Sequence, residues 1–494
     1  MIFFLIGVAL LITAFFTYGK VVERCFGITD EPTPAMRNPD GVDFVPLSWQ
    51  KAMLIQAVSI AGTGPIFGAI AGALWGYWAF IWIVLGCIFA GATHDYLAGM
   101  LSVRNNGANV SDLVGRYLGR YPKYIMTGFS MVLLVLVGTV FIASPANILR
   151  SLFSGDDQFF QIAVIVIILY YIIATVTPIN QIIGRIYPVL GIIMILSAVG
   201  IAIMMFVNNN WADMPEATLA NVNPRGMQIF PFLFITIACG AISGFHATQA
   251  PIMARCIKSE RVGLRVFHGS MIIEGLIAMI WAAVAMHHFG SLQGLADAGA
   301  APVVVSTVSM DLLGPIFGVI AVIGVVLLPI TSGDTAFRAC RMILADQIKM
   351  NQKPVMNRFV LAIPLFVIAV VLTFWVDFAV IWRYFAWSNQ TLATIALWTG
   401  AVYLKIYGRP YWIAYVPATF MTLIVTSYIV VAPEGFQLPL PVGIVTGIVI
   451  AIGLAIAFQV VPTKTKEQVE NYQQGGVVGG KGEGPENEAT GTGC

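Results

Sequence analysis

The sequence predicts an all-α integral membrane protein of about thirteen transmembrane helices, with a core of two inverted five-helix repeats that contain two broken helices. The first observation is composition: 58% of the 494 residues are hydrophobic, 10% are charged, and the mean hydropathy is +0.85. A soluble chain carries about a quarter charged residues, so this chain needs lipid as its solvent. The second observation is a series of long apolar segments, and the third is a glycine-rich interruption inside two of them.

Several other classes of protein are excluded by the same sequence. The net charge of +2 offers no basic surface for nucleic acid. The six cysteines show no paired spacing of the kind found in zinc sites or disulfide frameworks. Metalloprotease, serine hydrolase and phosphate-loop motifs are also missing from the chain. The sequence therefore predicts neither an enzyme nor a cofactor, and the expected partners are a small-molecule substrate and the lipid bilayer.

Each apolar segment can cross the hydrocarbon layer, which takes about 20 helical residues. Lys20 and Arg24 follow the first segment, the reverse of a secretory signal peptide, so we expect a retained helix there. The thirteen predicted spans are 2–19, 52–73, 77–102, 124–148, 158–177, 186–207, 228–254, 266–288, 313–336, 358–378, 383–404, 411–431 and 440–461.

Basic residues predict the orientation of these spans. If the N-terminus is outside, 23 of the 26 lysines and arginines lie in inner segments, and only Arg150, Arg225 and Arg383 lie outside. Positive residues collect on the inner side, so the chain is predicted N-out and C-in. The predicted organisation is an extra N-terminal helix (1–19), a cytoplasmic loop (20–51), a first repeat (52–207), a second repeat (228–404), two extra C-terminal helices (411–461) and a disordered cytoplasmic tail (462–494), with outer loops at 208–227 and 289–312.

Two spans are interrupted near the middle of the bilayer. Residues 62–65 read Gly-Thr-Gly-Pro, and residues 239–244 read Cys-Gly-Ala-Ile-Ser-Gly, where Ser243 is a plausible cap for the helix that follows. Glycines inside one span would be typical of close helix packing. Two interruptions at matched depth, in the second and seventh spans, instead indicate inverted repeats of five helices, as in many secondary transporters.

The interruptions predict where a substrate binds. Half-helix N-termini carry positive dipole ends, and free carbonyls point the other way, so such a site suits a small anion or zwitterion together with a cation. Glycines let the ligand approach the backbone. The predicted substrate-binding residues are Gly62, Thr63, Gly64, Ser243, Gly244, His246 and Gln249. His246 has a second interpretation, as a histidine satisfied inside the protein.

Acidic residues inside spans are costly and usually functional. Asp95, Glu274 and Asp334 are therefore candidates for proton coupling. For Asp95, structural pairing with an inner arginine is an equal alternative. Thr331 and Ser332 precede Asp334 in the segment TSGDT, and their hydroxyl groups suit Na⁺ as hard ligands. The same hydroxyl groups can also bond to the helix backbone one turn back.

Three longer stretches resemble the signature segments of a known transporter family. They are GTGPIFGAIAGALWG, FAGATHDYLAGMLSVRNNG and FPFLFITIACGAISGFHATQ. They look like segments of the carbon starvation protein A family, and the resemblance runs from about residue 45 to 345. It implies a bacterial inner-membrane transporter linked to the uptake of peptides and pyruvate, with a LeuT-type core of the amino acid/polyamine/organocation superfamily.

The segment TSGDT resembles the TSADS motif of betaine/choline/carnitine transporters. That resemblance implies a Na⁺ site formed by the side chains of Thr331 and Ser332 and the main-chain carbonyls of Ala61 and Gly62. The leading function hypothesis is a cation-coupled symporter, driven by H⁺ or Na⁺, for a small pyruvate-like carboxylate or a short peptide. A membrane sensor of nutrient state that resembles a transporter is the alternative, and a channel is the third hypothesis.

Overall fold

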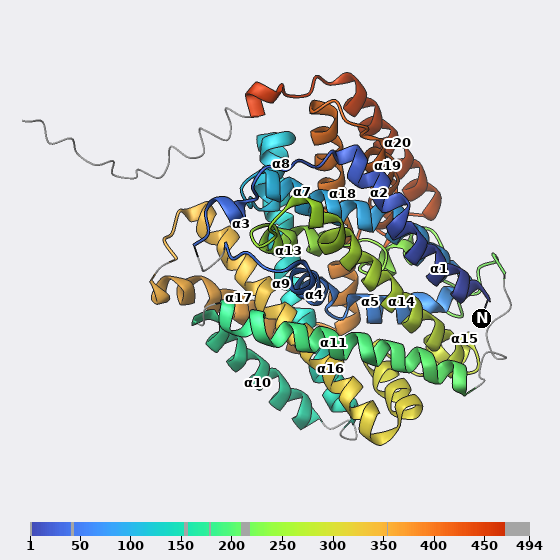
Figure 1. The fold of residues 1–494 in the computed structure, drawn as a ribbon. Helices are drawn as coiled ribbons and strands as arrows, with labels where there is room; N and C mark the ends of the chain where they lie inside the picture. Colours follow the sequence, from blue (N-terminus) through green and yellow to red (C-terminus); the bar gives the residue numbers. More distant parts are fainter. Residues whose placement is uncertain are drawn as a thin grey trace, which may run out of the picture.

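The computed structural model describes residues 2–40, 44–152, 157–176, 179–208, 218–352 and 354–469, which fold as a bundle of helices (Figure 1). The longer helices of the first part are α1 (Ile2–Phe16), α2 (Tyr18–Phe26), α4 (Trp49–Ala61), α5 (Gly64–Gly72), α6 (Tyr77–Leu85), α7 (Ala92–Arg104), α8 (Val110–Tyr117), α9 (Arg120–Leu152), α10 (Asp157–Val176) and α11 (Ile179–Val207). Those of the second part are α13 (Gly244–Ala254), α14 (Gly269–His288), α16 (Ala301–Ile348), α17 (Val355–Trp375), α18 (Phe378–Ile406), α19 (Trp412–Val431) and α20 (Leu440–Val460).

The described residues contain ten helices that are long and apolar enough to cross a membrane, or eleven when one bent pair is counted as a single span. Two of the thirteen predicted spans are not among these. The predicted span 228–254 is a short helix, α12 (Phe232–Thr236), followed by non-helical chain and α13. The predicted span 383–404 lies within α18, which is long enough but carries the polar residues Asn389 and Gln390 at its middle.

The first predicted break is confirmed. Helix α4 ends at Ala61, α5 begins at Gly64, and the two segments are bent by 49°. Gly62 has a φ of 46°, which an L side chain rarely adopts, so glycine suits this position. Pro65 lies in the first turn of α5, where its missing N–H is tolerated.

The second predicted break is also confirmed, and it is longer than the first. Helix α12 ends at Thr236 and α13 begins at Gly244, which leaves Ile237–Ser243 outside both helices. Ser243 occupies the N-cap position with extended backbone angles, but its side chain accepts no capping hydrogen bond. The predicted role of Ser243 as a side-chain cap is therefore wrong.

The connection after α14, which is predicted as an outer loop, is shorter than expected. Instead of a loop over 289–312, the chain forms α15 (Leu292–Asp297) and then enters α16 at Ala301. Gly314, with a φ of 73°, kinks α16 just before Pro315. The predicted span at 313–336 thus corresponds to the part of α16 that follows the kink. The prediction of a loop before Gly314 is wrong, because the helical turns there are too short to cross the bilayer by themselves.

The described residues of the predicted cytoplasmic loop 20–51 are partly helical. It contains α2 and a short helix, α3 (Pro34–Arg37), and Thr33 donates a hydrogen bond of 2.6 Å to the carbonyl of Ile257. Of the predicted outer loop 208–227, residues 209–217 lie outside the described residues. The same holds for residues 470–494 of the predicted tail.

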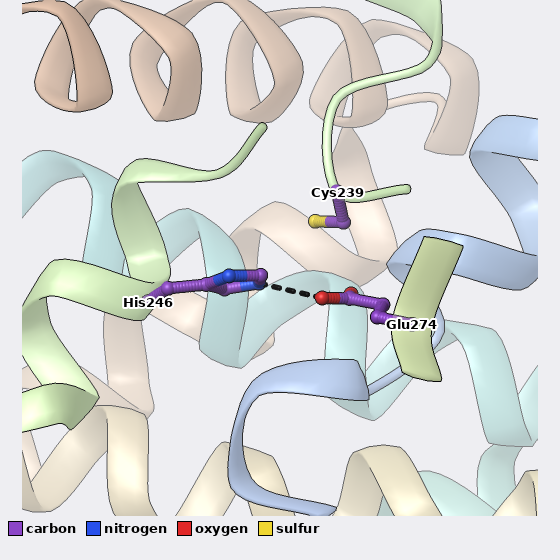
Figure 2. Close-up of side chains that lie close together, drawn as sticks. All are labelled: Cys239, His246 and Glu274. Atoms are coloured by element: carbon purple, nitrogen blue, oxygen red, sulfur yellow. Dashed lines mark ion pairs between the residues drawn. The ribbon is translucent and has the colours of Figure 1, made fainter. Parts of the chain in front are cut away.

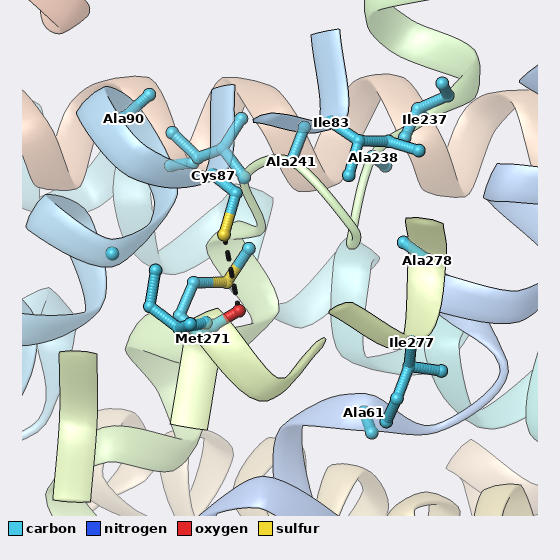
Figure 3. Packing of buried hydrophobic residues seen from close by; sticks show 14 of the residues in the cluster. Ala61, Ile83, Cys87, Ala90, Ile237, Ala238, Ala241, Met271, Ile277 and Ala278 are labelled. Atoms are coloured by element: carbon cyan, nitrogen blue, oxygen red, sulfur yellow. Dashed lines mark hydrogen bonds between the residues drawn. The ribbon is translucent and has the colours of Figure 1, made fainter. Parts of the chain in front are cut away.

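Packing brings the broken helices to the centre of the bundle. Helix α5 packs on α14, α13 packs on α7 and α18, and α16 runs along α9. Two π-helical turns interrupt long spans beside the breaks: η2 (Gly86–Gly91) precedes α7, and η5 (Leu264–His268) precedes α14. Cys87 of η2 donates a hydrogen bond to the carbonyl of Met271 in α14, which ties these two spans together inside the apolar core (Figure 3).

Candidate functional site

The two breaks lie directly against each other. A Cβ atom added at Gly64 would lie 2.3 Å from the Sγ of Cys239 and 2.4 Å from its Cβ. One and two turns further along α5, Gly68 faces the carbonyl of Thr236 and Gly72 faces the side chain of Ile237. These three glycines, spaced four residues apart, let α5 pack closely along the second break.

A chain of buried ionisable side chains lies beside this junction. The Nδ1 of His246 in α13 lies 2.8 Å from Oδ2 of Asp95. Figure 2 shows its other contact, in which Nε2 lies 3.2 Å from Oε2 of Glu274. The other oxygen of Asp95 lies 2.8 Å from Nδ1 of His94. All four side chains are at most 1% exposed. His246 therefore bridges two carboxylates that come from different spans.

The elements around the site explain how these residues meet. Asp95 lies one turn after the π-helical turn η2, and Glu274 lies in the second turn after η5. π-helical turns occur frequently at functional sites. Gly91 at the end of η2 faces the carbonyl of Ala241, where a Cβ atom would approach to 2.3 Å. This close approach brings the start of α7 against the second break.

Asn389 of α18 forms hydrogen bonds to the second break and to the start of α13. Its Oδ1 accepts hydrogen bonds from the backbone N–H of Phe245 (2.7 Å) and from the Oγ of Ser243 (3.2 Å). Its Nδ2 donates to Ser243 (3.1 Å) and to the Sγ of Cys239 (3.5 Å). Asn389 is absent from the residues that the sequence predicts for the site. For Asn389, the available signal was a polar Asn-Gln pair in the middle of an apolar segment.

The predicted substrate-binding residues separate into two groups. Gly64, Ser243 and His246 lie around Cys239 at the junction.

The other predicted substrate-binding residues have neighbours other than Cys239. Gly62 faces the ring of Phe141 in α9, and Gly244 faces the backbone of α18; a Cβ atom added at either glycine would lie 2.3 Å from the nearest atom. Thr63 is fully buried at the N-cap of α5, and Gln249 donates a hydrogen bond to Thr248. Gly62 and Gly244 therefore serve helix packing in this conformation.

The two hydroxyl groups predicted for a Na⁺ site donate hydrogen bonds to main-chain carbonyls. Ser332 donates a hydrogen bond of 3.2 Å to the carbonyl of Val58, which lies one turn before the predicted donors Ala61 and Gly62 in α4. Thr331 donates to the carbonyl of Leu328 within its own helix, at 2.8 Å. Ser332 thus faces the first broken helix, whereas Thr331 bonds to its own helix one turn back, which is the alternative interpretation of these hydroxyl groups.

Asp334 belongs to a different cluster from Asp95 and Glu274. It pairs with Arg338 at 3.5 Å, one turn further along α16. Tyr171 and Thr175 of α10 and Arg341 of α16 surround this pair. The three acids predicted for proton coupling therefore occupy two separate places.

Comparison with solved structures defines the fold class. The chain is similar to a mutant manganese transporter of Eremococcus coleocola, with a TM-score of 0.57 and 14% identity over 88% of this chain and 99% of that chain. It is also similar to MhsT in complex with L-phenylalanine, with a TM-score of 0.50 and 13% identity over 82% of this chain and 99% of the other. The protein is thus a multi-pass membrane protein with the LeuT fold.

Sequence comparison then places the chain in a family. Residues 1–165, 146–294 and 285–428 match the family described as carbon starvation protein CstA, and the chain belongs to this family. It is 41% identical to an uncharacterized membrane protein of Haemophilus influenzae, over 60% of this chain and 94% of that protein. It is 24% identical to the peptide transporter CstA of Campylobacter jejuni, over 80% and 74% of the two chains. Identity to the pyruvate/proton symporter BtsT of Escherichia coli is 25%, over 50% of this chain and 43% of that one.

Proposed function

We propose that this protein takes up a small carboxylate, pyruvate-like in size, by cation-coupled symport with alternating access. The observation that carries the proposal is the direct contact of two broken helices inside a LeuT-fold bundle. Broken helices at the repeat interface bind substrate and coupling ion in this class of transporter. The relative named as a pyruvate/proton symporter supports this substrate, and the relative named as a peptide transporter makes a short peptide the alternative.

The start of α13 is the place where we propose that the carboxylate binds. There the N–H of Phe245 and the hydroxyl of Ser243 both donate to the side-chain oxygen of Asn389. A substrate carboxylate presents the same kind of acceptor, and the positive end of the helix dipole favours its charge. On this proposal, the substrate displaces the Asn389 amide when it binds. The close contact between Gly64 and Cys239 favours a ligand of a few heavy atoms over a long peptide.

A proton is the coupling ion in the proposal. This choice rests on the relative named as a pyruvate/proton symporter. Sodium is the second candidate, because the oxygens of Ser332 and Val58 lie 3.2 Å apart between α16 and the first broken helix. Neutral oxygens of this kind bind hard cations. We further propose a bacterial inner-membrane location with the N-terminus outside, on the distribution of basic residues.

A ligand screen by thermal unfolding tests the proposal. Pyruvate, lactate, acetate and a set of dipeptides are added to purified protein, each with and without Na⁺. A ligand that binds the folded state raises the melting temperature in proportion to ln(1 + [L]/Kd). We expect stabilisation by a three-carbon carboxylate. Stabilisation by dipeptides alone would show that the substrate is a short peptide and not a small carboxylate. A response to none of these ligands would contradict the proposal.

A further inference from the structure

Three side chains that commonly bind metal ions converge at the junction of the breaks. They are Cys239 from the non-helical stretch of the second break, His246 from α13 and Glu274 from α14 (Figure 2). One ligand atom from each residue lies within 4.8 Å of the other two, and all three residues are buried. The three residues share no metal-binding spacing along the chain, so no sequence motif predicts this set.

The distance between His246 and Glu274 is close to that expected around a four-coordinate cation. With bonds of about 2.0–2.3 Å, the ligand atoms of a tetrahedral zinc site lie roughly 3.3–3.8 Å apart. The Nε2 of His246 and the Oε2 of Glu274 are already 3.2 Å apart. Three protein ligands also leave one coordination position open, as in zinc sites that bind a water molecule or a small ligand.

The residues behind His246 orient it as a metal ligand. Its Nδ1 is held at 2.8 Å by Asp95, and the second oxygen of Asp95 is held at 2.8 Å by His94. The Nε2 of His246 is therefore the atom that faces Glu274 and Cys239. A carboxylate behind a histidine is the usual second layer of a metal site, where it fixes the ring orientation and makes the ligand more basic.

Glu274 supplies the independent sign that a cation belongs here. Its side chain is 1% exposed, and neither of its oxygens has a hydrogen-bond partner among the described residues. Its only ion-pair contact in that part of the chain is His246. A buried carboxylate needs a compensating partner. A cation bound by Glu274, His246 and Cys239 would provide one.

We propose that Cys239, His246 and Glu274 bind one thiophilic divalent cation, of which Zn²⁺ is the representative. Thiolate and imidazole ligands favour Zn²⁺, Co²⁺ or Cu²⁺ over Mg²⁺ and Ca²⁺. The bound ion would link the second break to α14 and hold the break in place. The proposal is independent of the transported substrate, because it concerns binding to the protein alone.

Cobalt spectroscopy tests the site without any transport measurement. Co²⁺ is titrated into purified, chelator-treated protein from which any affinity tag has been removed. We expect one Co²⁺ per chain, with a thiolate-to-cobalt charge-transfer band that Cys239→Ser abolishes. Cys340→Ser is the matched control, because Cys340 is also a buried thiol but lies in α16, away from the cluster. A band that persists in Cys239→Ser, or no band in the parent protein, would overturn the proposal.

A second variant keeps the test valid if Cys239→Ser unfolds the protein. Asp95→Asn leaves all three ligands in place and removes the charge behind His246, so Zn²⁺ affinity should fall about 10- to 100-fold. The readout is the shift in melting temperature with Zn²⁺. His288 and Asp311 lie 3.0 Å apart and offer a second pair of Zn²⁺ ligands, so both proteins also carry His288→Ala. Parent protein whose melting temperature is indifferent to Zn²⁺ would show that His246 only bridges two carboxylates, and would refute the metal site.

Discussion

Replacing Gly64 by alanine would place a methyl group where Cys239 already lies. The new Cβ would be 2.3 Å from Sγ and 2.4 Å from Cβ of Cys239, whereas ordinary contact begins at 3.4 Å. The sulfur atom can rotate away, but the Cβ of Cys239 is fixed to the backbone. Either α5 or the second break must therefore move by about 1 Å, and overpacking of this kind costs about 1–3 kcal/mol. We expect a lower melting temperature and weaker substrate binding.

Matched variants separate this overlap from other effects of alanine. Gly128→Ala in α9 is the control, because a Cβ at Gly128 meets nothing within 4 Å. Gly64→Ala combined with Cys239→Gly moves the side chain from one break to the other and should restore much of the lost stability. Gly64→Leu should abolish substrate binding altogether. If Gly64→Ala melts at the same temperature as Gly128→Ala and binds substrate normally, the two breaks are not in contact, and the reasoning fails.

Three further predictions follow from the site and the topology. Asn389→Ala should lower stability by about 1–3 kcal/mol in thermal unfolding, because it leaves the buried N–H of Phe245 and hydroxyl of Ser243 without their acceptor; an unchanged melting temperature would show that water replaces the amide. Thr331→Ala with Ser332→Ala should remove any Na⁺ dependence of ligand binding, and should leave binding unchanged if the proton is the coupling ion; Na⁺ dependence that survives both changes would exclude this site. Gly480→Cys, in a chain without other cysteines, should resist an impermeant thiol reagent in intact cells, and its labelling there would overturn the N-out, C-in topology.

Composition and the glycine and proline residues that interrupt helices were enough to predict the fold class. Apolar length marked most spans, and Gly-Thr-Gly-Pro at 62–65 marked the first break, because glycine and proline act on the backbone at the position where they occur. The helix before Gly314 was predicted as loop because spans were recognised by their apolar length. A short helix without enough apolar length to cross the bilayer reads as loop in a search for spans.

The site was predicted only where a single residue is unusual by itself. Asp95, His246 and Glu274 were noticed because ionisable groups are rare inside spans. Their mutual contacts could not be predicted, since Asp95 and His246 are 151 residues apart in the chain. Cys239 is unremarkable as a single residue, and Asn389 shows only that a polar pair interrupts an apolar segment. They join the site because α18 packs on α13 and α5 lies against the second break.

Uptake of labelled pyruvate into proteoliposomes tests the transport proposal most directly. The purified protein is reconstituted, and separate vesicle batches receive an inward proton gradient, an inward Na⁺ gradient or no gradient, with Gly64→Leu as the inactive control. The account predicts accumulation above the external concentration that is driven by the proton gradient, is absent from Gly64→Leu vesicles and collapses when a protonophore is added. Pyruvate that binds the protein but never exceeds the external concentration under any gradient would contradict it, as a sensor or a channel would give that result.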